Sequence, residues 1–186
     1  MNRRSTLTIV LSLFLFVSIG FAQKSERPFR QGIWIAQGSV GFISGGLYGD
    51  VKVPPMNFVL EYAANNEYAY GFFGGYASSR VVVYRVFGED WGFDYNYLIL
   101  AGSASYHFEV DMKNVDGYGR VFLGYAILSA STFGPPGNYG SANASFAVYG
   151  AYVGATYYLT PQFGVQGEVG YGNIAVLRFG ITLKFQ

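Results

Sequence analysis

The sequence contains no cysteine and only one histidine, His107. Without cysteine there is no disulfide framework, no thiolate metal site and no cysteine for a lipid anchor. No cluster of His, Asp or Glu has the spacing of a metal site. We therefore expect no bound metal, no cofactor and no catalytic residue.

Charge is also scarce, because Asp, Glu, Lys and Arg make up only 12% of the chain. Soluble proteins average about 25%. A soluble domain of this size needs a charged outer surface, and this chain cannot supply one. The 12 Lys and Arg nearly balance the 11 Asp and Glu, so there is no basic excess of the kind that binds nucleic acid.

Long apolar runs are missing except near the N-terminus, where Leu7 to Ile19 follows Arg3 and Arg4. The run is shorter than the roughly 20 residues of a membrane-spanning helix. A positive start, an apolar stretch and small residues before a cut are typical of a secretory signal peptide. We predict a signal peptide over 1–22, cleaved between Ala22 and Gln23, and a short polar lead over 23–31. A membrane-anchoring helix is the alternative.

Aromatic residues (19%) and 26 glycines are abundant, and apolar residues alternate along the chain. The clearest case runs from Ile174 to Phe185. One face holds Ala175, Leu177, Phe179, Ile181, Leu183 and Phe185, and the other holds Ile174, Val176, Arg178, Gly180, Thr182 and Lys184. A period of two indicates a β-strand with two different faces. Only helices and closed barrels satisfy the backbone in lipid, and no spanning helix is present, so we expect a barrel.

The same alternation predicts eight strands. They cover residues 32–43, 56–63, 68–77, 95–108, 117–128, 146–159, 163–171 and 174–185. Short turns at 64–67, 109–116 and 160–162 alternate with long loops at 44–55, 78–94 and 129–145, and a tight turn at 172–173 precedes the last strand. This pattern is typical of an all-β, eight-stranded, antiparallel up-and-down transmembrane barrel with periplasmic turns and external loops. Here it spans 32–186. Loop 78–94 is expected to extend its two strands beyond the membrane, and the lipid-facing side of 68–77 is undecided.

Several charged residues fall on the inward faces of these strands. They are Glu61, Arg120, Glu168, Arg178 and Lys184. Glu168 and Arg178 lie at similar distances from the tight turn at 172–173, so we expect them to pair across the hairpin. The lumen of an eight-stranded barrel is only wide enough for side chains to fill. We predict a polar plug, with a narrow gated ion path as the alternative.

His107 has Ser105 two residues away on the same predicted face. A Ser-His pair can activate a nucleophile, and some eight-stranded barrels modify lipid A. Lipopolysaccharide lies in the outer leaflet, whereas His107 is predicted at the periplasmic rim. We therefore expect a rim residue and no enzyme.

The last strand, Arg178-Phe179-Gly180-Ile181-Thr182-Leu183-Lys184-Phe185, resembles the signal read by the barrel-assembly machinery: polar, any, Gly, two of any, apolar, any, aromatic. The positions that match are Arg178, Gly180, Leu183 and Phe185, and Gln186 departs from the pattern. With the hairpin 157–172, it makes residues 32–186 resemble the OmpA/OmpX-like superfamily of small outer-membrane barrels. The resemblance implies Sec export, periplasmic chaperones and insertion beside outer-membrane lipid and lipopolysaccharide. It implies no single activity.

The expected function is that of a structural or surface-interaction protein of the outer membrane. Its external loops would contact an unidentified extracellular partner, and we expect a monomer. A narrow pore or small-solute transporter and a lipid-modifying enzyme are the alternatives. A further alternative is a soluble secreted barrel of the lipocalin type, but the low content of charged residues disfavours it.

Overall fold

A computed structural model describes residues 28–186 except 44, 87, 135–139 and 173. The predicted signal peptide, its cleavage site at Ala22 and Gln23, and the first part of the lead lie outside the described residues. Eight strands make up the fold: β1 (Trp34–Ile43), β2 (Asp50–Ala63), β3 (Tyr68–Val86), β4 (Glu89–Glu109), β5 (Val115–Phe133), β6 (Ser141–Tyr158), β7 (Phe163–Tyr171) and β8 (Leu177–Phe185).

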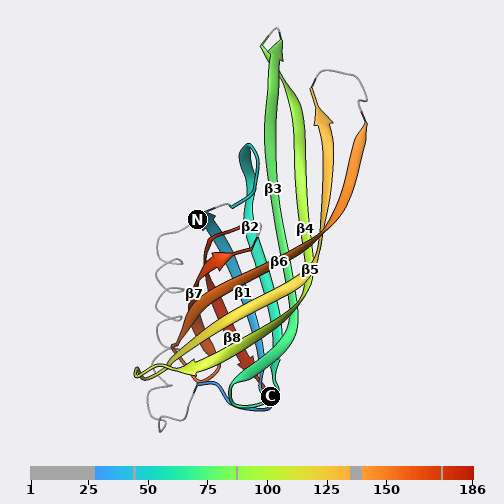
Figure 1. Ribbon diagram of the computed structural model, residues 1–186. Coiled ribbons are helices and arrows are strands. Elements are labelled where there is room, and N and C mark those ends of the chain that lie inside the picture. The colour runs from blue at the N-terminus through green and yellow to red at the C-terminus, as the bar shows by residue number, and fades with distance from the viewer. Residues whose placement is uncertain (1–27, 44, 87, 135–139, 173) are drawn as a thin grey trace, which may run out of the picture.

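The strands form one closed barrel in which each pairs antiparallel with the next along the chain. β8 closes the ring on β1, with Trp34 opposite Phe185. In the part of the chain that the structure describes, no helix is long and apolar enough to cross a membrane. The predicted up-and-down barrel of eight strands is confirmed (Figure 1).

The strands differ greatly in length. β7 and β8 have 9 residues each, close to the roughly 9–11 that cross a bilayer. β3, β4, β5 and β6 have 19, 21, 19 and 18 residues. Figure 1 shows these four rising well beyond β1, β7 and β8 on one side. We call this extension the distal wall (residues 78–94 and 129–145, as far as described), and the barrel end that carries it the distal end; the opposite end, beside Trp34 and Phe185, is the terminal end.

The distal wall corrects the prediction of long loops. Residues 78–94 extend the two neighbouring strands, as expected. They form a paired β-hairpin and not a loop, with Arg80 opposite Asp94 and Val86 opposite Glu89. Likewise β5 and β6 stay paired from Leu128–Ala144 to Ser131–Ser141. The predicted strands 68–77, 95–108, 117–128 and 146–159 therefore stop short, because strand pairing continues to Val86–Glu89 and to Ser131–Ser141.

The loop predicted at 44–55 is also shorter than expected, because β2 begins at Asp50. The predicted loop includes Pro54 and Pro55. They lie at an irregularity of the β2–β3 register, between Val53 and Met56. Proline cannot donate to a ladder, and a bulge is one of the places in a sheet that tolerates it.

The two faces of the strands have opposite chemistry. Large apolar side chains cover the outside, while the buried inward faces hold polar and charged side chains together with an aromatic cluster. The structure also decides β3, where Tyr68, Tyr70 and Phe72 are exposed and Phe73 is buried. The sequence could not decide this because both faces of β3 are aromatic and glycine.

Residues 174 and 175 contradict the predicted last strand. β8 begins only at Leu177, and both Ile174 and Ala175 are buried. The hydroxyl of Tyr152 donates to the carbonyl oxygen of Ala175 at 2.6 Å. The segment before β8 therefore folds over the interior at the distal end and does not continue the lipid-facing row.

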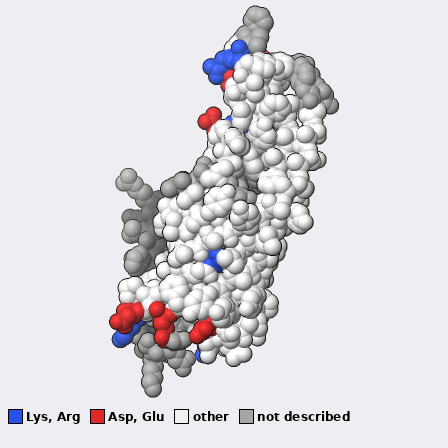
Figure 2. Space-filling model, viewed as in Figure 1, with Lys and Arg blue, Asp and Glu red and all other residues white. Residues whose placement is uncertain are grey.

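Charged side chains are absent from most of the outer wall seen in Figure 2. They gather at the two ends of the molecule, with one small basic spot between. The exposed residues of that middle band are apolar and aromatic, for example Leu123, Tyr125 and Val153. Such an exterior is suited to a bilayer, with polar groups kept inside.

Candidate functional site in the lumen and the distal wall

Four charged side chains meet inside the barrel and alternate in sign. The Arg120 guanidinium donates to Glu61 at 3.1 Å through both Nε and Nη2, and its Nη1 donates to Glu168 at 2.5 Å. It also donates to Gln37. Arg178 Nη2 lies 2.7 Å from Glu168 Oε2. The two acids and two arginines balance, as buried charges must if they are to remain ionised.

Glu61 is held by further donors. Ser103 Oγ donates to its Oε1 at 2.7 Å and Ser105 Oγ to its Oε2 at 2.8 Å. All three side chains are buried. The carboxylate of Glu61 therefore has both oxygens fully engaged on the inward face of β2.

Arg178 is tied more loosely than Arg120. Its guanidinium lies 3.5 Å from the centre of the Tyr152 ring and 5.3 Å from that of Phe73. Aromatic faces attract a guanidinium. Among the described residues, its Nε and Nη1 have no hydrogen-bond partner. The ionic cluster thus ends against aromatic rings on the distal side.

Those rings form a second, apolar layer across the lumen. Phe73 and Phe122 are stacked with centroids 4.3 Å apart and planes at 3°. Tyr152 stacks beyond Phe122 at 6.2 Å. Val59, Ile99 and other buried residues pack around them. The lumen is therefore filled in two layers, one ionic and one aromatic.

Lys184 was predicted to belong to the inward charged cluster of Glu61, Arg120, Glu168 and Arg178, but it lies apart from them. Its Nζ donates to the carbonyl oxygen of Pro28 at 2.5 Å and lies 3.7 Å from the centre of the Tyr158 ring. Both contacts are near the terminal end. Lys184 ties the lead residue Pro28 to β8 and does not reach Glu61 or Glu168.

His107 lies near the terminal end of β4, as predicted, but it is buried there, with 4% of its surface exposed. Its Nδ1 lies 3.0 Å from both carboxylate oxygens of Asp116, and its Nε2 lies 3.0 Å from Ser105 Oγ. The Phe29 ring stacks on the imidazole at 3.7 Å and 7°. The lead thus covers His107 at the terminal end.

Sequence reasoning missed Asp116, which it assigned to a charged turn. β5 begins at Val115 and turns Asp116 inward, opposite Glu109. The signal was available: Asp116, Tyr118 and Arg120 follow one another at a period of two, and all three are buried. Extending the fifth strand by two residues would have placed Asp116 beside His107.

The chain Asp116–His107–Ser105 has the connectivity of a catalytic triad. Ser105 Oγ, however, donates to Glu61 and is buried. A hydroxyl whose hydrogen is held by a carboxylate is not directed at a substrate. The three side chains extend the hydrogen-bonded network from Arg120 to the terminal end, which is a structural role. In the described ranges, no three His, Asp or Glu residues are grouped as a metal site.

The distal wall carries its own ion pairs. Asp94 accepts from Arg80 Nε at 2.7 Å and Nη2 at 2.8 Å, and from Lys52 Nζ at 2.8 Å. The Arg80 hydrogen bonds are the main reason that the pKa of Asp94 falls to about 2. Arg85 pairs with Asp90 nearer the tip. These cross-strand pairs hold the β3–β4 hairpin in register.

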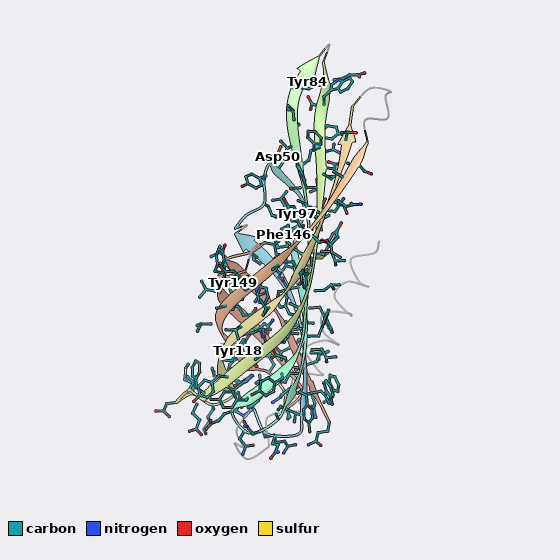
Figure 3. The ribbon with its side chains drawn as sticks, turned by 45° about the vertical axis from the view of Figure 1, so that its right-hand side comes forward. Asp50, Tyr84, Tyr97, Tyr118, Phe146 and Tyr149 are labelled. Atoms are coloured by element: carbon teal, nitrogen blue, oxygen red, sulfur yellow. The ribbon has the colours of Figure 1, made fainter. Side chains whose placement is uncertain are left out.

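Exposed aromatic residues also occur on the distal wall. Tyr84, near the tip in Figure 3, stacks on Trp91 at 5.7 Å and is 52% exposed. Tyr48, in the β1–β2 connection, is 75% exposed. The β5–β6 hairpin carries no charge, because no Asp, Glu, Lys or Arg lies between Arg120 and Glu168.

Comparison with known proteins supports the fold and nothing finer. No protein-family model and no curated protein matches the sequence. Three solved structures are similar: the N-terminal β-barrel domain of Pseudomonas aeruginosa OprF (12% identity, TM-score 0.54, 84% of this chain and 99% of that one), P. aeruginosa outer membrane protein OprG (13%, 0.54, 85% and 98%) and Neisserial surface protein A (16%, 0.55, 83% and 98%).

This is the fold of the small outer-membrane barrels. Together with the apolar exterior, it makes the chain an outer-membrane protein. The barrel crosses the membrane with the band that includes Leu123, Tyr125 and Val153, and the distal wall projects beyond it.

Proposed function

We propose that this outer-membrane barrel is a structural or surface-interaction protein that acts through its distal wall, on the outside of the cell. The observation that carries the proposal is that the two ends of the same sheet have different structures. Within the lipid-facing band, the barrel is filled by side chains. Beyond this band, at the distal end, β3, β4, β5 and β6 continue as exposed β-structure.

The filled lumen argues against the pore alternative. An ion that crosses the barrel must pass both the Glu61–Arg120–Glu168–Arg178 network and the stacked Phe73 and Phe122 rings. Each layer consists of buried side chains in direct contact. Conduction would require the two layers to open together.

The distal wall is suited to contact another surface because it is pre-formed. Paired strands lose less conformational freedom on binding than a loop does. Exposed Val83 and Tyr84 on the wall, and Tyr48 in the β1–β2 connection, offer apolar and aromatic contact area, and aromatic side chains are enriched in protein interfaces. One similar structure is named a surface protein, which agrees with this role.

The first experiment tests the orientation. A short epitope is inserted at Gly88, in the β3–β4 turn, or as a control at Asn66, in the β2–β3 turn at the other end. We expect antibody to label intact cells that carry the Gly88 insertion, and to label the Asn66 insertion only after permeabilisation. The reverse result would contradict an external distal wall.

The second experiment tests the activity. Cells expressing the Tyr48→Ser, Val83→Ser, Tyr84→Ser variant are compared with wild type for adherence to polystyrene, an apolar surface. The control is Glu67→Ser, in the turn at the terminal end. We expect lower adherence for the triple variant alone. Equal adherence together with conductance above background in planar bilayers would favour the pore.

A further inference from the structure

A cavity of about 200 Å³ lies at the distal end of the barrel, above the aromatic layer. Its lining comes from four neighbouring strands and two connections: Tyr97, Ile99, Ala126, Phe146 and Tyr171, with Gly45, Gly46 and Ile174. Figure 3 shows Tyr97 and Phe146 at the level where the distal wall leaves the barrel. None of the lining residues is charged.

Two of the residues that line the cavity are fully buried. Ile99 and Ile174 are buried in the same cluster as the stacked Phe73 and Phe122, which closes the cavity from below. Ile174 belongs to the segment that folds inward before β8. An apolar cavity of about 150 Å³ is large enough to bind benzene.

Besides the hydroxyl groups of Tyr97 and Tyr171 in the lining, one polar side chain without a partner lies close to Ile99 and Ile174. Asn57, on the inward face of β2, is 6% exposed, and neither its Oδ1 nor its Nδ2 has a hydrogen-bond partner among the described residues. A buried amide without partners is costly. Such a group calls for a ligand or a bound water.

The position of Asn57 follows from the space beside Gly75. A Cβ built on Gly75 would lie 3.3 Å from Asn57 Oδ1, 3.1 Å from Ile174 Cδ1 and 3.4 Å from Ile99 Cβ. The amide thus converges on the same point as two residues that line the cavity. It offers one acceptor and two donor hydrogens close to Ile99 and Ile174, although Asn57 is not itself one of the lining residues.

We propose that this cavity binds a small, uncharged, mostly apolar molecule that carries one hydrogen-bonding group, with that group on Asn57. The lining excludes a charged ligand, since no opposite charge would balance it. The volume limits the ligand to about the size of a substituted six-membered ring. This inference goes beyond the surface role of the distal wall and does not depend on it.

The test uses the refolded barrel in lipid nanodiscs, with isoleucine methyl groups labelled for NMR. Cyclohexanol and methylcyclohexane are the probes, because they have similar size and differ in one hydroxyl. Ile99 and Ile174 report the cavity, and lipid-facing Ile181 reports partition into the bilayer. We expect saturable cyclohexanol shifts at Ile99 and Ile174 and only linear, non-saturating shifts at Ile181. Shifts that do not saturate at either cavity residue would overturn the proposal.

Two variants separate the cavity from the polar group. Ala126→Phe fills the cavity and is expected to weaken cyclohexanol binding at least tenfold, whereas Ala151→Phe, on the lipid-facing side of β6, leaves it unchanged. In the wild type, we expect cyclohexanol to bind about tenfold more tightly than methylcyclohexane, which corresponds to one hydrogen bond. Asn57→Leu is expected to retain methylcyclohexane binding and to remove this difference in affinity. If Ala126→Phe does not fold, Asn57→Leu decides. Equal wild-type affinity for the two probes would mean that water alone serves Asn57, and would overturn its assigned role.

Discussion

Arg120 and Glu61 are joined by two hydrogen bonds of 3.1 Å across the lumen, although their strands, β5 and β2, are not neighbours in the sheet. Cross-strand pairs such as Glu168 and Arg178 can be expected from a hairpin. The Arg120–Glu61 pair exists only because the sheet closes. It connects opposite walls and makes the barrel interior a single network.

Replacing Arg120 with Met should strongly destabilise the barrel. The change leaves Glu61 and Glu168 buried without their common partner, and breaking a buried pair costs about 3–5 kcal/mol. Urea unfolding in lipid vesicles, followed by the gel mobility of the folded band, measures the loss. Arg85→Met near the exposed hairpin tip is the matched control, with no change in midpoint expected. A wild-type midpoint for Arg120→Met would mean that the network does not stabilise the fold.

Gly180 and Gly38 lie on the paired strands β8 and β1, and we expect opposite responses to alanine. A Cβ at Gly180 would lie 2.0 Å from the Gly38 carbonyl oxygen, whereas a Cβ at Gly38 would meet nothing within 4 Å. Gly180→Ala should therefore cost about 1–3 kcal/mol through overpacking, and Gly38→Ala should be tolerated.

Refolding of purified protein into vesicles separates this effect from recognition by the assembly machinery, which is absent from that experiment. If Gly180→Ala refolds with wild-type stability but fails to assemble in cells, the glycine of the predicted assembly signal serves recognition alone. Loss of stability in vitro would show that closure of β8 on β1 requires it.

The Arg80–Asp94 pair should stabilise the distal hairpin only above a definite pH. The pKa of Asp94 is lowered from 3.8 to about 2. A lowered carboxyl pKa gives stabilisation that is complete above about pH 4 and is lost as the pH falls through about 2. The carboxyl chemical shift of Asp94 measures its midpoint directly. Arg80→Gln should raise the midpoint toward 3.8, and by more than Lys52→Gln does. An unchanged midpoint in Arg80→Gln would contradict the pairing.

Much of the fold could be predicted from local alternation. The strand Phe163–Tyr171 has the predicted bounds, and Phe179, Ile181, Leu183 and Phe185 form the exposed row predicted for the last strand, whereas Ala175 is buried. A period of two is a property of adjacent residues, so it survives without any knowledge of the partner strand. Where both faces are alike, as in β3, the same signal carries no information.

The strand ends were harder to predict for a physical reason. Predicted ends relied on the width of a membrane, on proline and on polar composition. β4 continues from Tyr95 back to Glu89 because β3 pairs with it as far as Glu89 and β5 as far as Gly92. A neighbouring ladder compensates for residues that would be loop on their own, and that compensation cannot be read from one segment.

The sequence by itself determined that this chain forms eight strands with apolar residues outside and a few charges inside. The reason is that successive side chains of a strand point to opposite faces, so every second residue belongs to the same face. Tertiary structure alone decided which inward groups meet: Arg120 with Glu61, His107 with Asp116, and Asn57 with Ile174 beside Gly75. Those contacts cross the lumen or join segments far apart in the chain, and their distances depend on how far each strand is shifted against the next when the barrel closes.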